Sequence, residues 1–82
     1  HNRNPSGLAA DGELLWVTDR ARDRIFVYDR LGRNRGSWRL DSANRRPTGV
    51  AIEPEGGNGL WVVDGLTDSV FYYSQGRTFR NG

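Results

Sequence analysis

The sequence predicts an all-β chain that contains two copies of one antiparallel unit of four strands. The chain of 82 residues repeats itself, its apolar segments are short, and glycine-bearing turns separate them. These segments are rich in β-branched and aromatic residues, as strands are, and the turns carry the Asp-Gly and Asn-Gly pairs that hairpins favour. No stretch keeps a 3.6-residue apolar period, so we expect no helix.

The repeat is visible position by position. Residues 2–9 align with residues 44–51 at an offset of 42, and residues 15–17 align with residues 60–62 at an offset of 45. The second copy has three extra residues in the turn between its first two strands. Repeats of 40 to 45 residues with four strands each are typical of propeller blades.

The two units, residues 1–43 and residues 44–82, each divide into four candidate strands. In chain order these are 7–10, 14–18, 24–28 and 37–40, then 49–52, 60–63, 69–73 and 78–80. The third strand of each unit is apolar or aromatic at almost every position. A sheet with one solvent-facing side would alternate apolar and polar residues, so we expect both faces of these strands to be buried.

These features predict two four-stranded antiparallel β-propeller blades per chain, which close into a full propeller by homo-oligomerisation. A domain of this size buries a small core, and the chain has no Cys and a single His at position 1, so neither disulfides nor a histidine-rich metal site can reinforce it. Each chain should therefore expose two apolar faces that only another copy can cover. The competing interpretation is a self-contained sandwich of eight strands.

The two ends of the sequence support a ring. Joined end to end, "FRNG" and "HNRNPSG" match the internal join "WRLDSANRRPTG", so the chain resembles a two-blade excerpt, natural or engineered, of a longer cyclic pattern. A head-to-tail contact between identical chains must close into a ring or grow into a fibre. With two blades per chain, a homotrimer of six blades is expected, and a homotetramer of eight blades is the alternative.

The repeated pattern resembles a known family. Pro-x-Gly-[Leu/Val]-Ala, a glycine turn and Leu-Trp-Val-x-Asp, followed by Asp and [Ile/Val], is similar to the NHL-repeat propellers and to the related gluconolactonase-like six-bladed propellers. The resemblance covers almost the whole chain, twice. Known members carry a full ring in one chain, and the basic position of the first unit, Arg24, is Ser69 in the second. The family includes RNA-binding, protein-binding and catalytic members, so the resemblance implies a fold more than a function.

The resemblance also implies where a ligand would bind. The turns between second and third strands should share one end of the propeller with the joins between blades. The candidate ligand-binding residues of that end are Asp19, Arg20, Arg22, Arg24, Arg45, Arg46 and Asp64. Because an Asp at a strand end can accept hydrogen bonds from the N–H groups of its own turn, we expect no metal and no cofactor at the two aspartates.

The tryptophans have two expected roles. Trp16 and Trp61 lie in mid-strand between Leu and Val, so they should pack between blades. Trp38 lies on an outermost strand beside Arg39, which suggests partial exposure and a side groove for a ligand.

Composition limits the function classes. The net charge is +2, and five acids balance six bases at the candidate end, so we do not expect nucleic-acid binding. No apolar run is long enough to span a membrane. No Cys-His or Ser-His-Asp set is available, so we expect no enzyme. The prediction is a self-assembling propeller module, a structural or binding scaffold. The alternatives are a multivalent lectin-like or protein- or RNA-binding propeller, and a metal-dependent lactonase-like enzyme.

Overall fold

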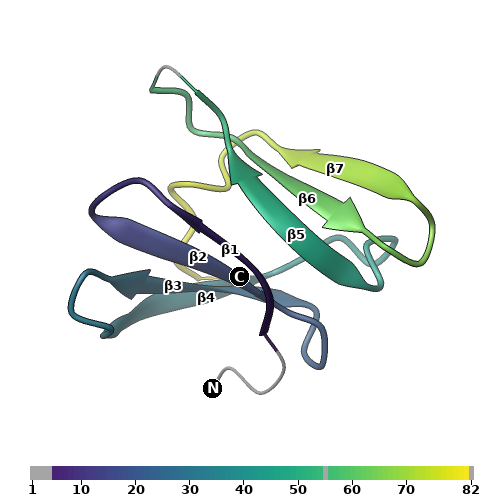
Figure 1. Cartoon of the computed structure of the whole chain (residues 1–82), viewed down its shortest axis with the longest axis horizontal. Helices are drawn as coiled ribbons and strands as arrows, with labels where there is room; N and C mark the ends of the chain where they lie inside the picture. The colour runs from purple at the N-terminus through teal and green to yellow at the C-terminus, as the bar shows by residue number, and fades with distance from the viewer. Residues whose placement is uncertain (1–4, 55, 82) are drawn as a thin grey trace.

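The computed structural model describes residues 5–54 and 56–81, which form two antiparallel sheets without a helix (Figure 1). The first sheet has four strands in chain order, β1 (Pro5–Ala10), β2 (Leu14–Asp19), β3 (Arg24–Asp29) and β4 (Asn34–Arg39). The second has three, β5 (Pro47–Ile52), β6 (Leu60–Asp64) and β7 (Ser69–Tyr73). The all-β prediction and seven of the eight expected strands are confirmed.

The repeat extends to backbone conformation. The turns after β2 and β6 each place an aspartate in the left-handed region, Asp23 at φ 54° and Asp68 at φ 53°. Asp tolerates this region better than most residues, because its short polar side chain can bond locally. Both first hairpins also carry an irregularity at the same place, between Pro5 and Gly7 in one unit and between Pro47 and Gly49 in the other.

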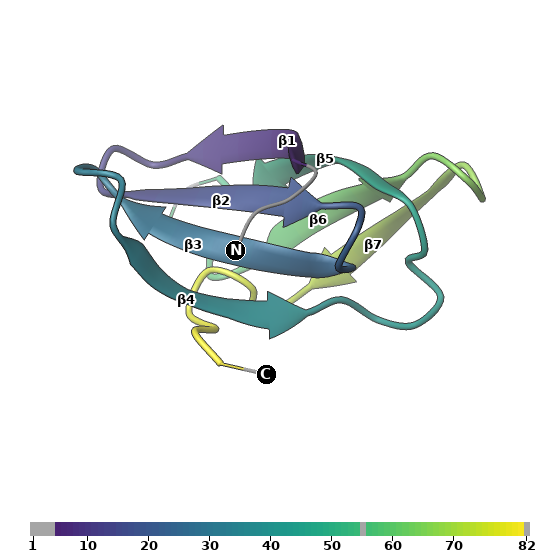
Figure 2. The ribbon, with the colours of Figure 1, turned by 90° about the horizontal axis from the view of Figure 1, so that it is seen from below.

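The two sheets pack face to face, with β1 beside β5 (Figures 1 and 2). We call the two faces that meet the inner faces and the two that point away the outer faces. The buried core between the inner faces consists of Trp16, Ile25, Val27, Trp38, Leu40, Leu60 and Val62. A core drawn from both sheets makes each sheet dependent on the other for burial of apolar surface.

β1 and β5 approach each other at two equivalent glycines. A Cβ added to Gly7 would lie 2.7 Å from the Cα of Gly49, closer than any side chain allows. Beside this contact, the Ser6 hydroxyl donates to the carbonyl of Pro47 at 2.6 Å. The glycine removes the steric barrier and the hydroxyl satisfies a strand carbonyl, so the two innermost strands can touch.

The expected strand 78–80 is wrong. Residues 74–78 form turns, and the segment then crosses to the first sheet, as the yellow ribbon shows in Figure 2. There the N–H of Ser37 donates to the carbonyl of Arg80 at 2.9 Å, and the ring of Phe79 meets the indole of Trp38 edge-on at 5.0 Å. The open edge of β4 and the apolar indole attract this segment more than the edge of β7 does, so the second sheet keeps three strands.

Burial of the third strands differs between the sheets. Ile25, Phe26 and Val27 of β3 are buried, which confirms burial on both faces of that strand. In β7, Val70 and Tyr72 are 63% and 49% exposed, so the same expectation is wrong within a single chain. Among the described residues no third sheet covers the outer face of either sheet, yet Phe26 on the outer face of β3 is buried, whereas Val70 and Tyr72 on that of β7 are not.

Candidate functional site

The strand-end aspartates organise the predicted ligand end. The Oδ1 atom of Asp64 accepts from the N–H groups of Leu66 and Thr67, at 2.8 and 3.1 Å, and its Oδ2 accepts from those of Arg45 and Arg46, at 2.6 and 3.3 Å. One buried carboxylate thus joins its own turn to the segment that links the two sheets. Such a carboxylate has few lone pairs left for a ligand.

Asp19 has the corresponding position in the first sheet. Its Oδ1 accepts from the N–H groups of Ala21 and Arg22, at 2.9 and 3.2 Å, and its side chain is fully buried. Both aspartates therefore cap their own turns, which is the structural role anticipated from the sequence.

Burial alone would raise the pKa of the Asp64 carboxyl, because it disfavours the charge. The backbone N–H groups of Thr67, Arg46, Leu66 and Arg45 outweigh that effect and hold the pKa below its ordinary value. Hydrogen bonds from several N–H groups stabilise the ionised form. Asp64 is a charged structural group at neutral pH.

The predicted arginines do not form one cluster. Arg22 and Arg45 line a hollow together with Arg39, Asp23 and Asp41. In contrast, Arg24 points elsewhere and donates to the hydroxyl of Ser37 at 3.0 and 3.2 Å. The side chains of Arg20 and Arg46 are exposed and lie outside this hollow. The structure brings together two of the five predicted arginines, with acids between them.

The expected partial exposure of Trp38 is wrong. Its indole is 2% exposed, because Tyr73 and Phe79 both pack edge-on against it at 5.1 and 5.0 Å. The C-terminal segment covers the surface on which a ligand would have stacked. Trp16 is fully buried in the core between the two sheets, as predicted. Trp61, for which the sequence predicts the same burial, is only half-buried, so that prediction is wrong within a single chain.

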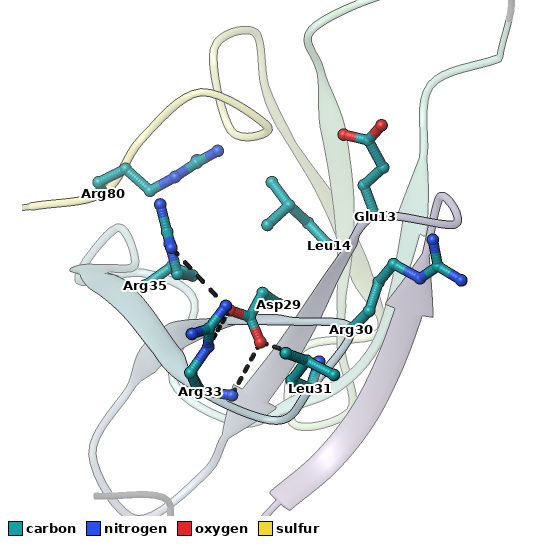
Figure 3. Close-up of a pocket in the computed structure, with 8 residues that line it drawn as sticks. All are labelled: Glu13, Leu14, Asp29, Arg30, Leu31, Arg33, Arg35 and Arg80. Carbon is teal, nitrogen blue, oxygen red and sulfur yellow. Dashed lines mark hydrogen bonds and ion pairs between the residues drawn. The ribbon is translucent and has the colours of Figure 1, made fainter.

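A second, arginine-lined hollow of about 540 Å³ lies at the other end of the first sheet (Figure 3). This hollow is not among the sites predicted from the sequence. Its lining residues are Glu13, Leu14, Asp29, Arg30, Leu31, Arg33, Arg35 and Arg80. Four arginines against two carboxylates give this hollow a positive charge. The density of arginine in "DRLGRNR" was a visible signal, but the approach of Arg80 depends on the unexpected course of the C-terminal segment.

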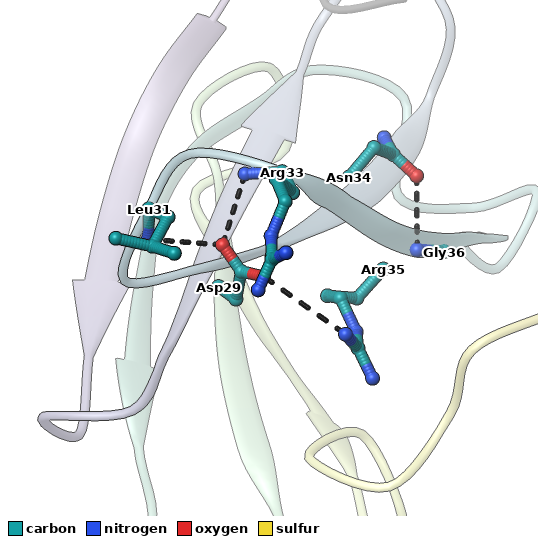
Figure 4. Close-up of polar contacts among 6 residues, drawn as sticks. All are labelled: Asp29, Leu31, Arg33, Asn34, Arg35 and Gly36. Carbon is teal, nitrogen blue, oxygen red and sulfur yellow. Dashed lines mark hydrogen bonds and ion pairs between the residues drawn. The ribbon is translucent and has the colours of Figure 1, made fainter.

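Asp29 holds the turn that carries these arginines (Figure 4). Its Oδ1 accepts from the N–H groups of Leu31 and Arg33, at 2.9 and 3.0 Å, and its Oδ2 accepts from Nε of Arg33 at 2.8 Å. The backbone N–H and then the guanidinium of Arg33 hold the pKa of the Asp29 carboxyl below its ordinary value. Arg35 is a more distant neighbour at 3.9 Å, and its side chain stays 55% exposed.

The outer faces carry exposed apolar side chains, most of them on the second sheet. On the second sheet, Val63, Val70 and Tyr72 are 42%, 63% and 49% exposed, and Trp61 is half-buried against Tyr72 at 5.3 Å. On the first sheet, Leu8 is 63% exposed. Monomeric proteins seldom expose contiguous apolar patches without a partner. On the first sheet's outer face, Val17 and Tyr28 are half-buried and Phe26 is buried, so exposure is clear only on the second sheet. The expectation that both faces need another copy stays a prediction.

Repeat positions relate the outer faces to the inner ones. Along the outer face of the second sheet, Trp61, Val63, Val70 and Tyr72 are the repeat equivalents of Trp16, Thr18, Ile25 and Val27 on the inner face of the first. Along the outer face of the first sheet, Leu8, Leu15, Val17 and Tyr28 are the equivalents of Val50, Leu60, Val62 and Tyr73 on the inner face of the second. Each outer face is thus a second copy of a face that is already paired inside the chain.

Comparison with known proteins gives no family assignment. No protein-family model matches the chain, and no curated protein shows significant similarity to it. Within residues 5–54 and 56–81, no three His, Cys, Asp or Glu side chains lie together as a metal site would require. The same part of the chain contains no helix long and apolar enough to cross a membrane.

Proposed function

We propose that this protein is a self-assembling β-propeller repeat module, a scaffold without catalytic activity whose partner is its own chain. One observation carries the proposal: each outer face is the repeat equivalent of an inner face that finds its partner within the chain. Surfaces built for the same contact should make that contact again. The resemblance to NHL-repeat propellers supports the same conclusion.

The relation between the faces supports a ring. The contact inside the chain joins two different faces, so repeating it between chains gives a heterologous, head-to-tail assembly. Such an assembly is finite only if it closes, and propellers close with about four to eight blades. Three copies give six blades, the number that the family resemblance favours, and four copies give eight.

Solution mass tests this proposal. Sedimentation should give about three times the monomer mass of 9.3 kDa, and the melting temperature should rise with protein concentration. Joining three copies in tandem through Gly82 and His1 should keep the ring and remove the concentration dependence. A stable monomer whose melting temperature does not change over a hundredfold range of concentration would refute the proposal.

A further inference from the structure

We infer that the contact between copies repeats the contact within the chain residue for residue. In this contact, the arginine-bearing turn of β3 and β4 of one copy docks on the turn of β5 and β6 of the next. This inference rests on the proposed assembly and names its interface. It has two parts, a close approach of backbones near the ring axis and a polar clamp at one end of the sheets.

The backbone part follows from β1 and β5. Inside the chain, Gly7 meets the Cα of Gly49, and the Ser6 hydroxyl donates to the carbonyl of Pro47. The repeat equivalents of Gly7 and Ser6 are Gly49 and Thr48. The position of the Gly49 Cβ is open, since only Cγ2 of Val63 lies near it, at 4.0 Å. In the assembly, this outer side of Gly49 receives Gly7 of the preceding copy, and the Thr48 hydroxyl donates to the Pro5 carbonyl of that copy.

The polar part follows from Arg77. Its guanidinium lies over the ring of Trp16 at 5.6 Å, and it donates to the Asp11 carboxylate at 2.7 Å and to the carbonyl of Gly57 at 2.6 Å. Arg77 thereby fastens the turn after β7 to the turn between β1 and β2. A cation that contacts both an indole ring and a carboxylate is held more firmly than in a simple exposed ion pair.

Each member of this clamp has a repeat equivalent at the unpartnered surfaces. Arg33 follows Gly32 as Arg77 follows Gly76, Trp61 corresponds to Trp16, and Glu53 corresponds to Asp11. In the assembly, Arg33 of one copy lies over Trp61 of the next and pairs with its Glu53.

These groups are available in the single chain. The Arg33 side chain is 68% exposed, although it pairs with Asp29. Among residues 5–54 and 56–81, the partners of the Glu53 carboxylate are neutral, the N–H of Gly59 at 3.0 Å and the hydroxyl of Tyr72 at 2.8 Å. An exposed arginine in the turn after β3 and, within the described residues, a Glu53 carboxylate whose partners are neutral are complementary, which points to a second copy as the partner.

The first test is Gly49→Ala. The added methyl group has room within the chain and Gly49 has an ordinary φ, so the β-sheet circular dichroism of the monomer should be unchanged. In the assembly, the same methyl group would meet the backbone of Gly7 in the neighbouring copy. Sedimentation should therefore give a monomer at concentrations where the wild type is assembled. Assembly of Gly49→Ala with wild-type affinity would overturn the inference.

The second test is a charge exchange. Arg33→Glu and Glu53→Arg should each weaken association by about tenfold or more, and the double variant should recover most of the loss, because like charges oppose and the exchanged pair attracts. Arg30→Glu makes the same charge change in the same turn, away from the clamp position, and should have a smaller effect. Equal effects of Arg30→Glu and Arg33→Glu, or no recovery in the double variant, would overturn the clamp.

The tests separate the two proposals. A wild type that stays monomeric refutes the assembly itself. A wild type that assembles while Gly49→Ala and the charge exchange have no effect leaves the assembly standing and refutes only this interface.

Discussion

Trp16 and Trp61 have the same position in two repeats but different surroundings. Trp16 is fully buried between the sheets under Arg77, whereas Trp61 lies half-buried on an outer face against Tyr72. Their neighbours in sequence are nearly the same, Leu before and Val after. The difference between them therefore comes from the presence or absence of a covering sheet.

Local features, in contrast, are the same in both units. The aspartates at the ends of β2 and β6 cap equivalent turns, and the φ angles of Asp23 and Asp68 are nearly equal, 54° and 53°. Turn geometry is determined by the few residues of the turn, while burial is determined by distant segments. The two units are thus alike in local structure and unlike in tertiary contacts.

The largest expected effect is a stability difference between the two tryptophan variants. Trp16→Ala should cost about 3–5 kcal/mol of unfolding free energy, because it leaves a cavity between the sheets. At low protein concentration, where copies are separate, Trp61→Ala should cost clearly less. Urea unfolding followed by circular dichroism measures both, and Trp16→Phe provides a milder variant if Trp16→Ala does not fold.

Protein concentration sharpens this comparison. If copies assemble as proposed, Trp61 becomes buried and the cost of Trp61→Ala should approach that of Trp16→Ala at high concentration. Equal costs at every concentration would show that the two surroundings do not differ energetically.

A smaller effect is expected for the two clamp arginines in the single chain. Arg77→Ala should lose about 1–2 kcal/mol, since Arg77 has an indole, a carboxylate and a carbonyl as partners and its ion pair is largely shielded. Arg33→Ala should lose about 0–1 kcal/mol, as exposed ion pairs do. Arg77→Lys keeps the charge without the planar fork and should recover only part of the loss. Thermal melts at low concentration would rank the three variants, and a larger loss for Arg33→Ala would contradict the comparison.

The smallest effect concerns the acid side of the stability curve. The folded-state pKa of Asp64 lies below its ordinary value of 3.8, so its contribution is fully present above that pH and is lost as the pH falls through the folded-state value. Asp64→Asn should therefore be less stable than the wild type at pH 7, and the difference should shrink below about pH 4. Asp68→Asn, at an exposed site where Asn also tolerates the left-handed conformation, is the control at pH 7 and should cost less stability there than Asp64→Asn. Urea unfolding of the wild type and both variants at a series of pH values measures these stability differences.

The sequence predicted those structural features that depend on residues close together in the chain. Seven strands and the capping roles of Asp19 and Asp64 follow from apolar runs and turn chemistry, which act over a few positions. The exposure of Trp38 and the strand 78–80 were mispredicted for one common reason. The C-terminal segment places Phe79 on Trp38 and Arg80 beside Ser37, contacts between residues about 40 positions apart that no local pattern encodes. The propeller ring, the homotrimer and the ligand end stay predictions.

The residues that pack over Trp16 and Trp38 are synthesised after the first sheet. The four strands of the first sheet are complete at Arg39, but Leu60, Val62, Tyr73 and Phe79, which close over Trp16 and Trp38, come later in the chain. At about 5–20 residues per second, a ribosome takes roughly two to eight seconds to add them. Until those residues have left the ribosome, the two indole rings of an emerged first sheet have no cover from their own chain. A pause in translation after the first sheet has emerged and before Phe79 has would prolong this exposure and favour aggregation of the unfinished chain.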